Sequence, residues 1–282
     1  MKQDCHMHMV LDGVYWKDAI ARHRSGADLE FVRRTLDAYR RQGYTYLRDG
    51  GDRWGVGAAA RDLAGEYGIV YRTPLAPLCA RGHYGAFIGE TYENMREFAD
   101  LVAKHRVHGA DFIKIMISGL MDFDRFGVLT EEGLPPDQIR ELIHIAHEEG
   151  FSVMAHANGA RTAEAAALAG VDSVEHGAYM DEDSLQTLAE SKTVWVPTLS
   201  TIGNLRRKER FNEDAVVQIL GCAMENLRRF AELGGLIAPG SDAGAWAVDH
   251  AMDTEWELLC QALGPDASAI LHRGTQQIMK KF

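Results

Sequence analysis

Short apolar segments alternate along the chain with longer amphipathic ones, and each short segment is a predicted β-strand. These segments lack strict polar–apolar alternation, as expected for parallel strands that are covered on both faces. Glycines such as Gly43, Gly109 and Gly150 stand directly before them and predict the ends of the preceding helices. The pattern predicts eight strands, near residues 3–9, 44–49, 69–78, 112–117, 151–157, 171–176, 193–199 and 236–241.

The segments between the strands have the period of helices with one buried face. Val32, Leu36 and Tyr39 fall on one side of such a helix. Pro135 and Pro136 precede another helical segment, where proline suits the first turn. Strands and helices therefore alternate through the chain, which indicates an α/β protein with a parallel sheet.

Eight strand–helix units predict a closed (βα)8 TIM barrel. A barrel of about 250 residues uses nearly all of the 282 residues, so we predict a single domain spanning 1–282. An open doubly wound sheet is the alternative, and it is disfavoured because candidate site residues come from both ends of the chain and from the middle. Irregular stretches near 13–28, 79–91 and 118–135 follow strands and are expected to form the rim of the barrel.

Composition narrows the classes of partner. The net charge is -11, from 30 basic and 41 acidic residues, which argues against nucleic acid or an anionic membrane surface. A small-molecule substrate is the expected partner. The four cysteines form no CxxC pair, the N-terminus has no apolar run, and no segment reaches the roughly 18 apolar residues of a membrane span. We therefore expect a cytoplasmic protein.

The first predicted strand carries two histidines that suit a metal ion. Asp4-Cys5-His6-Met7-His8 places His6 and His8 on the same face, because side chains in a strand alternate with period two. A lone histidine is more often a core residue. A pair on a first strand, with more histidines at other strand ends, favours metal ligation instead.

Three further candidate ligands lie where later strands end. His156 ends Ser152–His156, His176 ends Ser173–His176, and Asp242 follows the eighth strand. Each could instead cap a helix or lie in a loop. In a closed barrel strands one and eight are neighbours, so Asp242 is the expected carboxylate partner of His6 and His8.

Lys114 lies in an almost wholly apolar strand, Phe112–Ile117. Burying its ammonium group is costly and lowers its pKa. Three alternatives are then open for the Lys114 side chain. It forms a salt bridge, it stays a neutral amine for Schiff-base chemistry, or it reacts with carbon dioxide to give a carbamate that bridges two metals. With four histidines and Asp242 at hand, we favour the carbamate.

Other polar residues after the strands are weaker candidates. His83 and Tyr84 follow the third strand and His250 follows the eighth, so all three are candidate substrate contacts. Arg48 ends the second strand and is expected to form a buried ion pair with Asp49 rather than to bind a substrate carboxylate.

Taken together, these motifs resemble the amidohydrolase superfamily of metal-dependent hydrolases, in its prolidase- and imidazolonepropionase-like branch. Asp4–His8 is similar to the DxHxH motif of that family, and Phe112–Met116 to its lysine strand. The segments around His156, His176 and Asp242 match the later ligand strands. The resemblance covers nearly the whole chain, most clearly residues 107–244.

The resemblance implies one or two divalent metal ions, with zinc the first expectation. His6, His8 and Asp242 are expected to hold one metal and His156 with His176 the other, bridged by carbamylated Lys114. Asp242 is then the catalytic base and acid, and the metals ionise the attacking water. The usual flanking β-sandwich is not expected. A barrel that lacks this cover is expected to bury the exposed flank in a homo-oligomer.

The expected activity is hydrolysis of a C–N bond in a small amide, dipeptide or cyclic amide. A lactonase or esterase in the same site is the nearest alternative, since the metal chemistry does not depend on the leaving atom. A Schiff-base lyase using Lys114 is an alternative of another class. A non-catalytic metal-binding protein is disfavoured by the complete ligand set.

Overall fold

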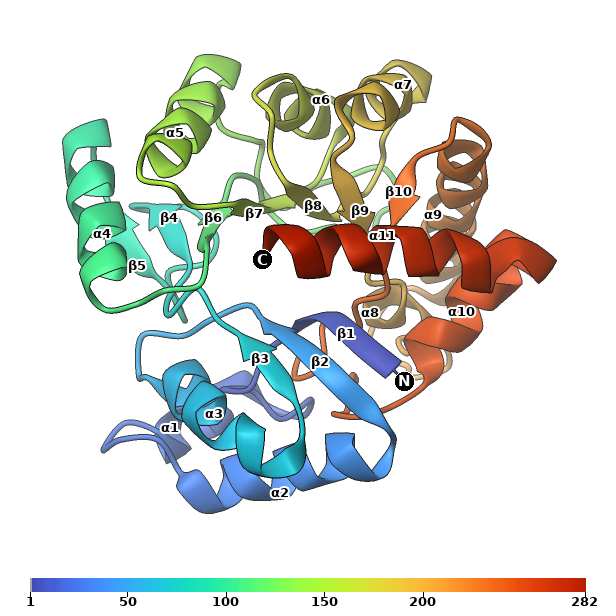
Figure 1. Ribbon diagram of the computed structural model, residues 1–282. Helices are drawn as coiled ribbons and strands as arrows, with labels where there is room; N and C mark the ends of the chain where they lie inside the picture. The colour runs from blue at the N-terminus through green and yellow to red at the C-terminus, as the bar shows by residue number, and fades with distance from the viewer. Residues whose placement is uncertain (1) are drawn as a thin grey trace.

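The computed structural model describes residues 2–282 and contains the eight predicted strands, all in parallel pairs. They follow one another around a ring, which Figure 1 shows with α11 in front of it. The strands are β1 (Lys2–Met7), β2 (Tyr44–Asp49), β3 (Val70–Arg72), β6 (Ile113–Met116), β7 (Val153–Ala157), β8 (Ser173–His176), β9 (Val194–Val196) and β10 (Leu236–Ile237).

Backbone hydrogen bonds close the ring at two seams between a three-stranded sheet, β1-β2-β3, and a sheet that runs from β10 to β6. At the first seam, Asp111 N donates to Thr73 O (3.0 Å), which joins β3 to the start of β6. The second seam joins β1 to the chain after β10 through three bonds: Cys5 N to Pro239 O (2.9 Å), Asp242 N to His6 O (2.7 Å) and His8 N to Ala243 O (2.7 Å). The predicted (βα)8 barrel is therefore confirmed, and the open sheet was the wrong alternative.

Two of the stretches expected to be irregular contain short elements. Residues 13–28 include α1 (Trp16–Arg22), and residues 79–91 lie in or between β4 (Leu78–Ala80) and β5 (Glu90–Tyr92). β4 pairs with both β5 and β6, so these two strands extend the sheet beside the barrel. Elements of three to seven residues are too short for a periodic pattern, which is why the sequence did not predict them.

Amphipathic helices surround the ring. In α2 the buried residues are Val32, Thr35, Leu36 and Tyr39, on the predicted face, and Asp28 caps the first turn. The helices that follow the strands or connect them are α2 (Leu29–Arg41), α3 (Val56–Ala64), α4 (Met95–Val107), α5 (Pro136–Glu148), α6 (Ala160–Leu168), α7 (Glu182–Ser191), α8 (Ser200–Gly203), α9 (Glu213–Glu232) and α10 (Thr254–Leu263), with 3-10 turns at Gly65–Tyr67 and Gly264–Asp266.

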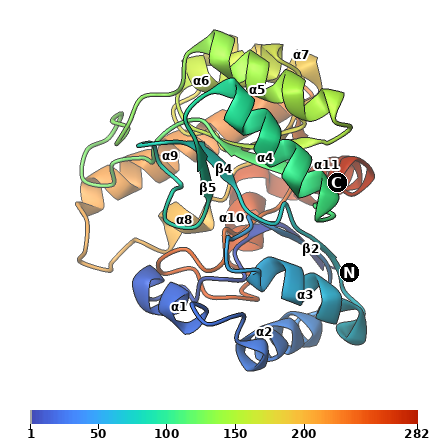
Figure 2. The same ribbon diagram turned by 90° about the vertical axis from the view of Figure 1, so that its left-hand side faces the viewer.

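A final helix, α11 (Ala267–Lys281), lies across one end of the barrel (Figure 1). It packs so closely on β10 that a Cβ atom on Gly274 would lie 2.0 Å from the Ile237 carbonyl oxygen. Ile278 and Phe282 join a buried cluster with residues such as Phe112 and Met154 from the barrel strands. Figure 2 shows α11 on one side of the barrel and the long connecting loops on the opposite side.

Every strand in residues 2–282 belongs to one of the two sheets, so this part of the chain holds no β-sandwich. No helix in the same residues has the length and the apolar content that crossing a bilayer requires.

Candidate metal centre

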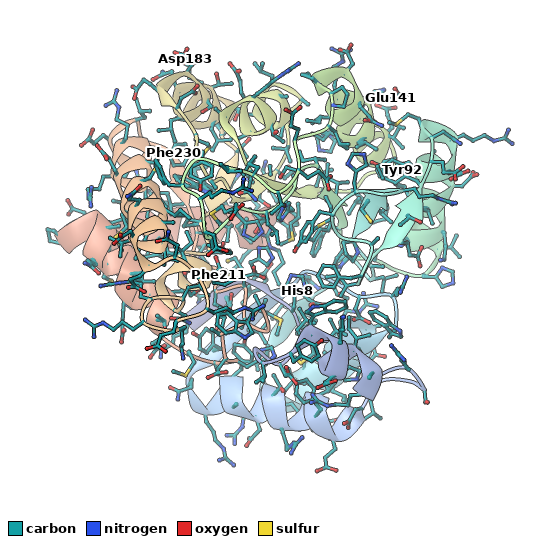
Figure 3. All side chains as sticks on the ribbon, turned by 180° about the vertical axis from the view of Figure 1, so that it is seen from behind. His8, Tyr92, Glu141, Asp183, Phe211 and Phe230 are labelled. Carbon is teal, nitrogen blue, oxygen red and sulfur yellow. The ribbon has the colours of Figure 1, made fainter. Side chains whose placement is uncertain are left out.

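His6, His8 and Asp242 come together at the carboxyl ends of the strands, on the side away from α11. Their ligand atoms all lie within 4.8 Å of one another. The Nε2 atoms of His6 and His8 lie 3.5 Å and 3.3 Å from Asp242 Oδ1. Figure 3 views this side of the molecule and labels His8. The pairing of β1 with the chain after β10 therefore brings residues from the two ends of the sequence into one site.

Lys114 reaches the same centre from β6. Its side chain is buried, and Nζ lies 3.1 Å from His6 Nε2. Burial lowers the pKa of the Lys114 amine, although Asp242 and Glu175 act in the opposite direction. Among the described residues no carboxylate forms an ion pair with it, so the salt-bridge alternative has no support. A buried amine with a lowered pKa is more readily neutral, and a neutral amine is nucleophilic.

His156 and His176 complete the group at the ends of β7 and β8. Their ring centroids are 4.6 Å apart, and the His176 ring lies 5.1 Å from that of His6. His156 Nε2 lies 3.0 Å from the Gly119 carbonyl oxygen, and His176 Nδ1 lies 2.7 Å from Thr198 Oγ1. Each ring therefore keeps one nitrogen for another partner.

The electrostatics of the site favour neutral imidazoles around an anionic carboxylate. Burial lowers the pKa of His176 to about 4 and takes the pKa values of His6 and His156 well below their usual range. Burial alone would raise the pKa of Asp242, but the neighbouring His6 and His8 lower it far below its usual range. Neutral imidazoles and an ionised carboxylate are the protonation states that bind a divalent cation.

Two of the candidate ligands lie on unusual backbone. His176 has φ 66° and Asp242 has φ 55°, in the left-handed region that side chains other than glycine rarely adopt. Such conformations persist only where the surrounding structure enforces them, and they cluster at functional sites. His8 is also confined, since a Cβ on Gly50 would lie 2.1 Å from its Cε1 atom.

The donor set suits a divalent metal ion such as zinc. Nitrogen and carboxylate donors converge, and His8 Nδ1 is buried without a hydrogen-bond partner among the described residues. The presence of an unpaired polar atom beside these donors fits a site that binds a further group.

One sequence-based expectation at the site was wrong. Arg48 does not pair with Asp49. Its Nη2 atom donates instead to Glu175 Oε1 at 2.9 Å, while Asp49 accepts from Met9 N and Thr73 Oγ1. Adjacent residues in a strand point to opposite faces, which separates Arg48 from Asp49. Glu175, which the sequence analysis assigned no role, also lies 2.8 Å from His6 Nδ1. The available signal was a glutamate placed directly between the apolar Val174 and the candidate ligand His176.

The candidate substrate residues Tyr84 and His83 lie in different surroundings. The Tyr84 ring centroid lies 5.0 Å from that of His156, so Tyr84 borders the centre. Phe87 contacts Tyr84, and Trp16 contacts Phe87, with centroids 5.8 Å and 5.3 Å apart. His83 is more exposed and its Nδ1 atom pairs with Glu131. An aromatic row therefore leads from the centre to the exposed Trp16.

His250 holds two loops together and has no free ring nitrogen for a substrate. Its Nδ1 atom lies 3.2 Å from Tyr39 Oη, and its Nε2 atom lies 2.9 Å from the Leu11 carbonyl oxygen. The contacts of His250 therefore do not support its assignment to substrate binding. Its partners, Tyr39 and Leu11, are distant in the sequence, so a local pattern could not reveal them.

Replacing His250 with leucine is expected to lower the free energy of unfolding by about 1–3 kcal/mol, because Tyr39 and Leu11 lose their partner. Urea denaturation of the variant and the wild type measures this difference. Unchanged stability together with a raised KM would return His250 to the substrate site.

The comparisons with known proteins agree with this fold. No family model matches the sequence. Ochratoxinase from Aspergillus niger is 27% identical over 237 residues, which cover 71% of this chain and 47% of that protein. Its crystal structure superposes with a TM-score of 0.76 at 19% identity, covering 98% of this chain and 70% of the other. A Xaa-Pro dipeptidase with bound methionine in its active site gives a TM-score of 0.75 at 22% identity, over 99% of this chain and 74% of that one.

A crystal structure described as an amidohydrolase also superposes with a TM-score of 0.75 at 21% identity, over 99% of this chain and 74% of the other. The chain has the fold of the prolidase-like amidohydrolases. The resemblance drawn from the motifs is thereby confirmed. The chain spans about half the length of the curated relatives that it matches in sequence.

Proposed function

We propose that this protein is a metal-dependent hydrolase that cleaves a C–N bond in a small amide, dipeptide or cyclic amide. The observation that carries the proposal is the convergence of His6, His8, His156, His176, Asp242 and Lys114 at the carboxyl ends of the barrel strands. The similarity to ochratoxinase and to a Xaa-Pro dipeptidase supports it. When bound there, a divalent metal supplies charge that ionises water near neutral pH and polarises a carbonyl group.

The residues divide into two sets of ligands. His6, His8 and Asp242 would hold one ion, and His156 with His176 would hold a second. Lys114 is proposed to bridge them; its amine contacts His6, whose ring neighbours that of His176, and these two contacts support the proposal. We infer that the neutral amine adds to carbon dioxide, losing a proton and becoming a carbamate with two oxygen donors. The mixed nitrogen and oxygen ligands make zinc the expected metal.

Asp242 is the proposed general base and acid. Its carboxylate is ionised over the whole physiological pH range, because the histidines beside it lower its pKa. It accepts the proton of the attacking water at one carboxylate oxygen and delivers it to the leaving nitrogen. The strained backbone at residue 242 fixes this carboxylate relative to His6 and His8, which reduces the reorganisation needed for proton transfer.

Tyr84 and His83 are proposed to contact the substrate. Tyr84 presents a ring beside His156, and the row that continues to Phe87 and Trp16 offers an apolar surface to a substrate side group. His83 lies further out with Glu131, where it can meet the polar end of the substrate.

Ester or lactone hydrolysis in the same site is the second candidate function, because the proposed chemistry does not depend on the leaving atom. A Schiff-base lyase is favoured by one observation, the lowered pKa of buried Lys114. Reduction with borohydride in the presence of substrate separates the two classes. A covalent adduct on Lys114 would support the lyase and contradict the metal ligand role.

Removing metal is expected to abolish hydrolysis. The purified protein is analysed for bound metal, then screened against amides, dipeptides and lactones before and after dialysis against a chelator. We expect one or two ions per chain, loss of turnover without them, and recovery with zinc. Turnover that survives complete removal of metal contradicts the proposal, and tight metal binding without turnover of any substrate indicates a binding protein.

A further inference from the structure

Glu175 links the candidate metal centre to the packed interior of the barrel. It lies on β8 immediately before His176, and its side chain is fully buried. One carboxylate oxygen, Oε2, lies 2.8 Å from His6 Nδ1. The other, Oε1, accepts from Arg48 Nη2 at 2.9 Å and from Ser173 Oγ at 2.5 Å. Each oxygen therefore has a distinct partner.

The contacts of His6 define which of its nitrogens carries the proton. A carboxylate only accepts hydrogen bonds, so Nδ1 must donate to Glu175. In the neutral imidazole the lone pair then resides on Nε2, the atom that faces Lys114 and Asp242. This is the tautomer that presents a ligand atom to the centre. Among the described residues, Glu175 is the hydrogen-bond partner of His6 Nδ1, so its carboxylate favours this tautomer.

Arg48 supplies the positive charge that a fully buried carboxylate requires. Its guanidinium is itself completely buried, donates from Nε to the Cys5 carbonyl oxygen at 2.6 Å, and from Nη1 to Ser173 Oγ at 2.9 Å. It stacks 4.4 Å from the centroid of the Phe282 ring. An arginine with this many fixed contacts cannot follow small movements of the site, so it anchors Glu175 in one position.

We propose that Glu175, anchored by Arg48, is a positioning residue that sets the tautomer and orientation of His6 and thereby the affinity of the centre for metal. The inference deepens the proposed function and rests on it. Outer partners of metal-binding histidines commonly act in this way, and losing one costs about 10–100-fold in metal affinity. Among the described residues the Glu175 carboxylate forms hydrogen bonds with His6, Arg48 and Ser173 and with no other candidate ligand, so its role is to position His6 rather than to take part in the reaction.

Glu175→Gln tests the inference with the least change in volume. The amide oxygen can still accept from Arg48 and Ser173, which places the amide NH2 group against His6 Nδ1. Nδ1 must then accept, the proton moves to Nε2, and the ligand atom is lost to the centre. We expect zinc affinity, measured by competition with a chromophoric chelator, to fall about 10–100-fold. Nitrogen NMR of the metal-free protein with labelled histidine should show the His6 proton on Nε2 instead of Nδ1.

Asp172→Asn is the matched control. Asp172 lies just before β8 at the other end of the barrel, where its carboxylate pairs with His147 and Lys281. The Asp172→Asn variant loses a partly buried carboxylate that does not contact His6, so the zinc affinity of this variant should stay at the wild-type value. If Glu175→Gln fails to fold, the double variant Arg48→Met, Glu175→Leu removes both buried charges together with the acceptor for His6 Nδ1, and serves in its place.

The outcomes separate the two levels of the proposal. Wild-type protein that binds no zinc contradicts the proposed function itself. Wild-type protein that binds zinc, with a folded Glu175 variant that binds it equally well and keeps the proton on Nδ1, overturns the positioning role alone. Weaker zinc binding with the altered His6 tautomer supports it.

Discussion

Replacing Asp242 with asparagine is expected to lower kcat by a factor of about 10²–10⁴, the range for losing a general acid–base group. Asparagine keeps the shape of the side chain but cannot take a proton from water at neutral pH. His6→Ala should be equally inactive for another reason, because it removes a nitrogen donor and leaves the first ion without a complete ligand set. Steady-state kinetics and metal content measure the two effects.

Both variants should remain folded, since the barrel is held by strand pairing and by the core on both sides of the ring. Thermal unfolding followed by circular dichroism checks this. Asp172→Asn again serves as the control and should keep wild-type kcat. Full activity in either His6→Ala or Asp242→Asn would exclude these residues from the reaction.

Lys114→Met is expected to remove nearly all activity, because methionine has almost the same length but no amine. Loss of the bridging ligand should cost at least one metal ion. Polarisation by a metal is worth several kcal/mol, and about 1.4 kcal/mol corresponds to a tenfold change in rate. The expected loss in kcat is therefore about 10³-fold or more.

If Lys114 forms a carbamate, a small carboxylate should be able to replace it, which is not expected if Lys114 acts as a simple amine. Lys114→Ala leaves space where the side chain stood, and a small carboxylate such as acetate or propionate should restore part of the activity and of the metal content. Lys114→Arg, which keeps a positive charge but forms no carbamate, should not respond. Equal activity of wild type and Lys114→Met would contradict any role of Lys114 in the reaction.

The parts of this structure that could be predicted from the sequence are those with local signals. Each strand is a short apolar run closed by a turn, so the eight strands and the residues that end them were found from neighbours a few positions away. The histidine pair at residues 6 and 8 depends on nothing more than the alternation of side chains in a strand. Asp242 required one further step, the closure that makes the first and last strands neighbours.

The remaining features depend on contacts between distant segments. Arg48 and Glu175 are 127 positions apart, and only the curvature of the ring brings both side chains into its interior. His250 and Leu11 are 239 positions apart and meet through loop conformations that have no sequence pattern. The short strand β4 is stabilised by pairing with β6 and with β5, and β5 by pairing with β4, rather than by their own composition. A single sequence contains no information about such pairings that could be recognised locally.

Helix α11 covers one end of the barrel, and the connecting loops surround the other end (Figure 2). Ile278 and Phe282 pack there in one buried cluster with residues of the barrel strands. We therefore expect a cation, carbon dioxide or a substrate to reach the histidines from the loop side, and the products to leave by the same route. The rates of substrate entry and product release are then expected to depend on the loops around that end of the barrel.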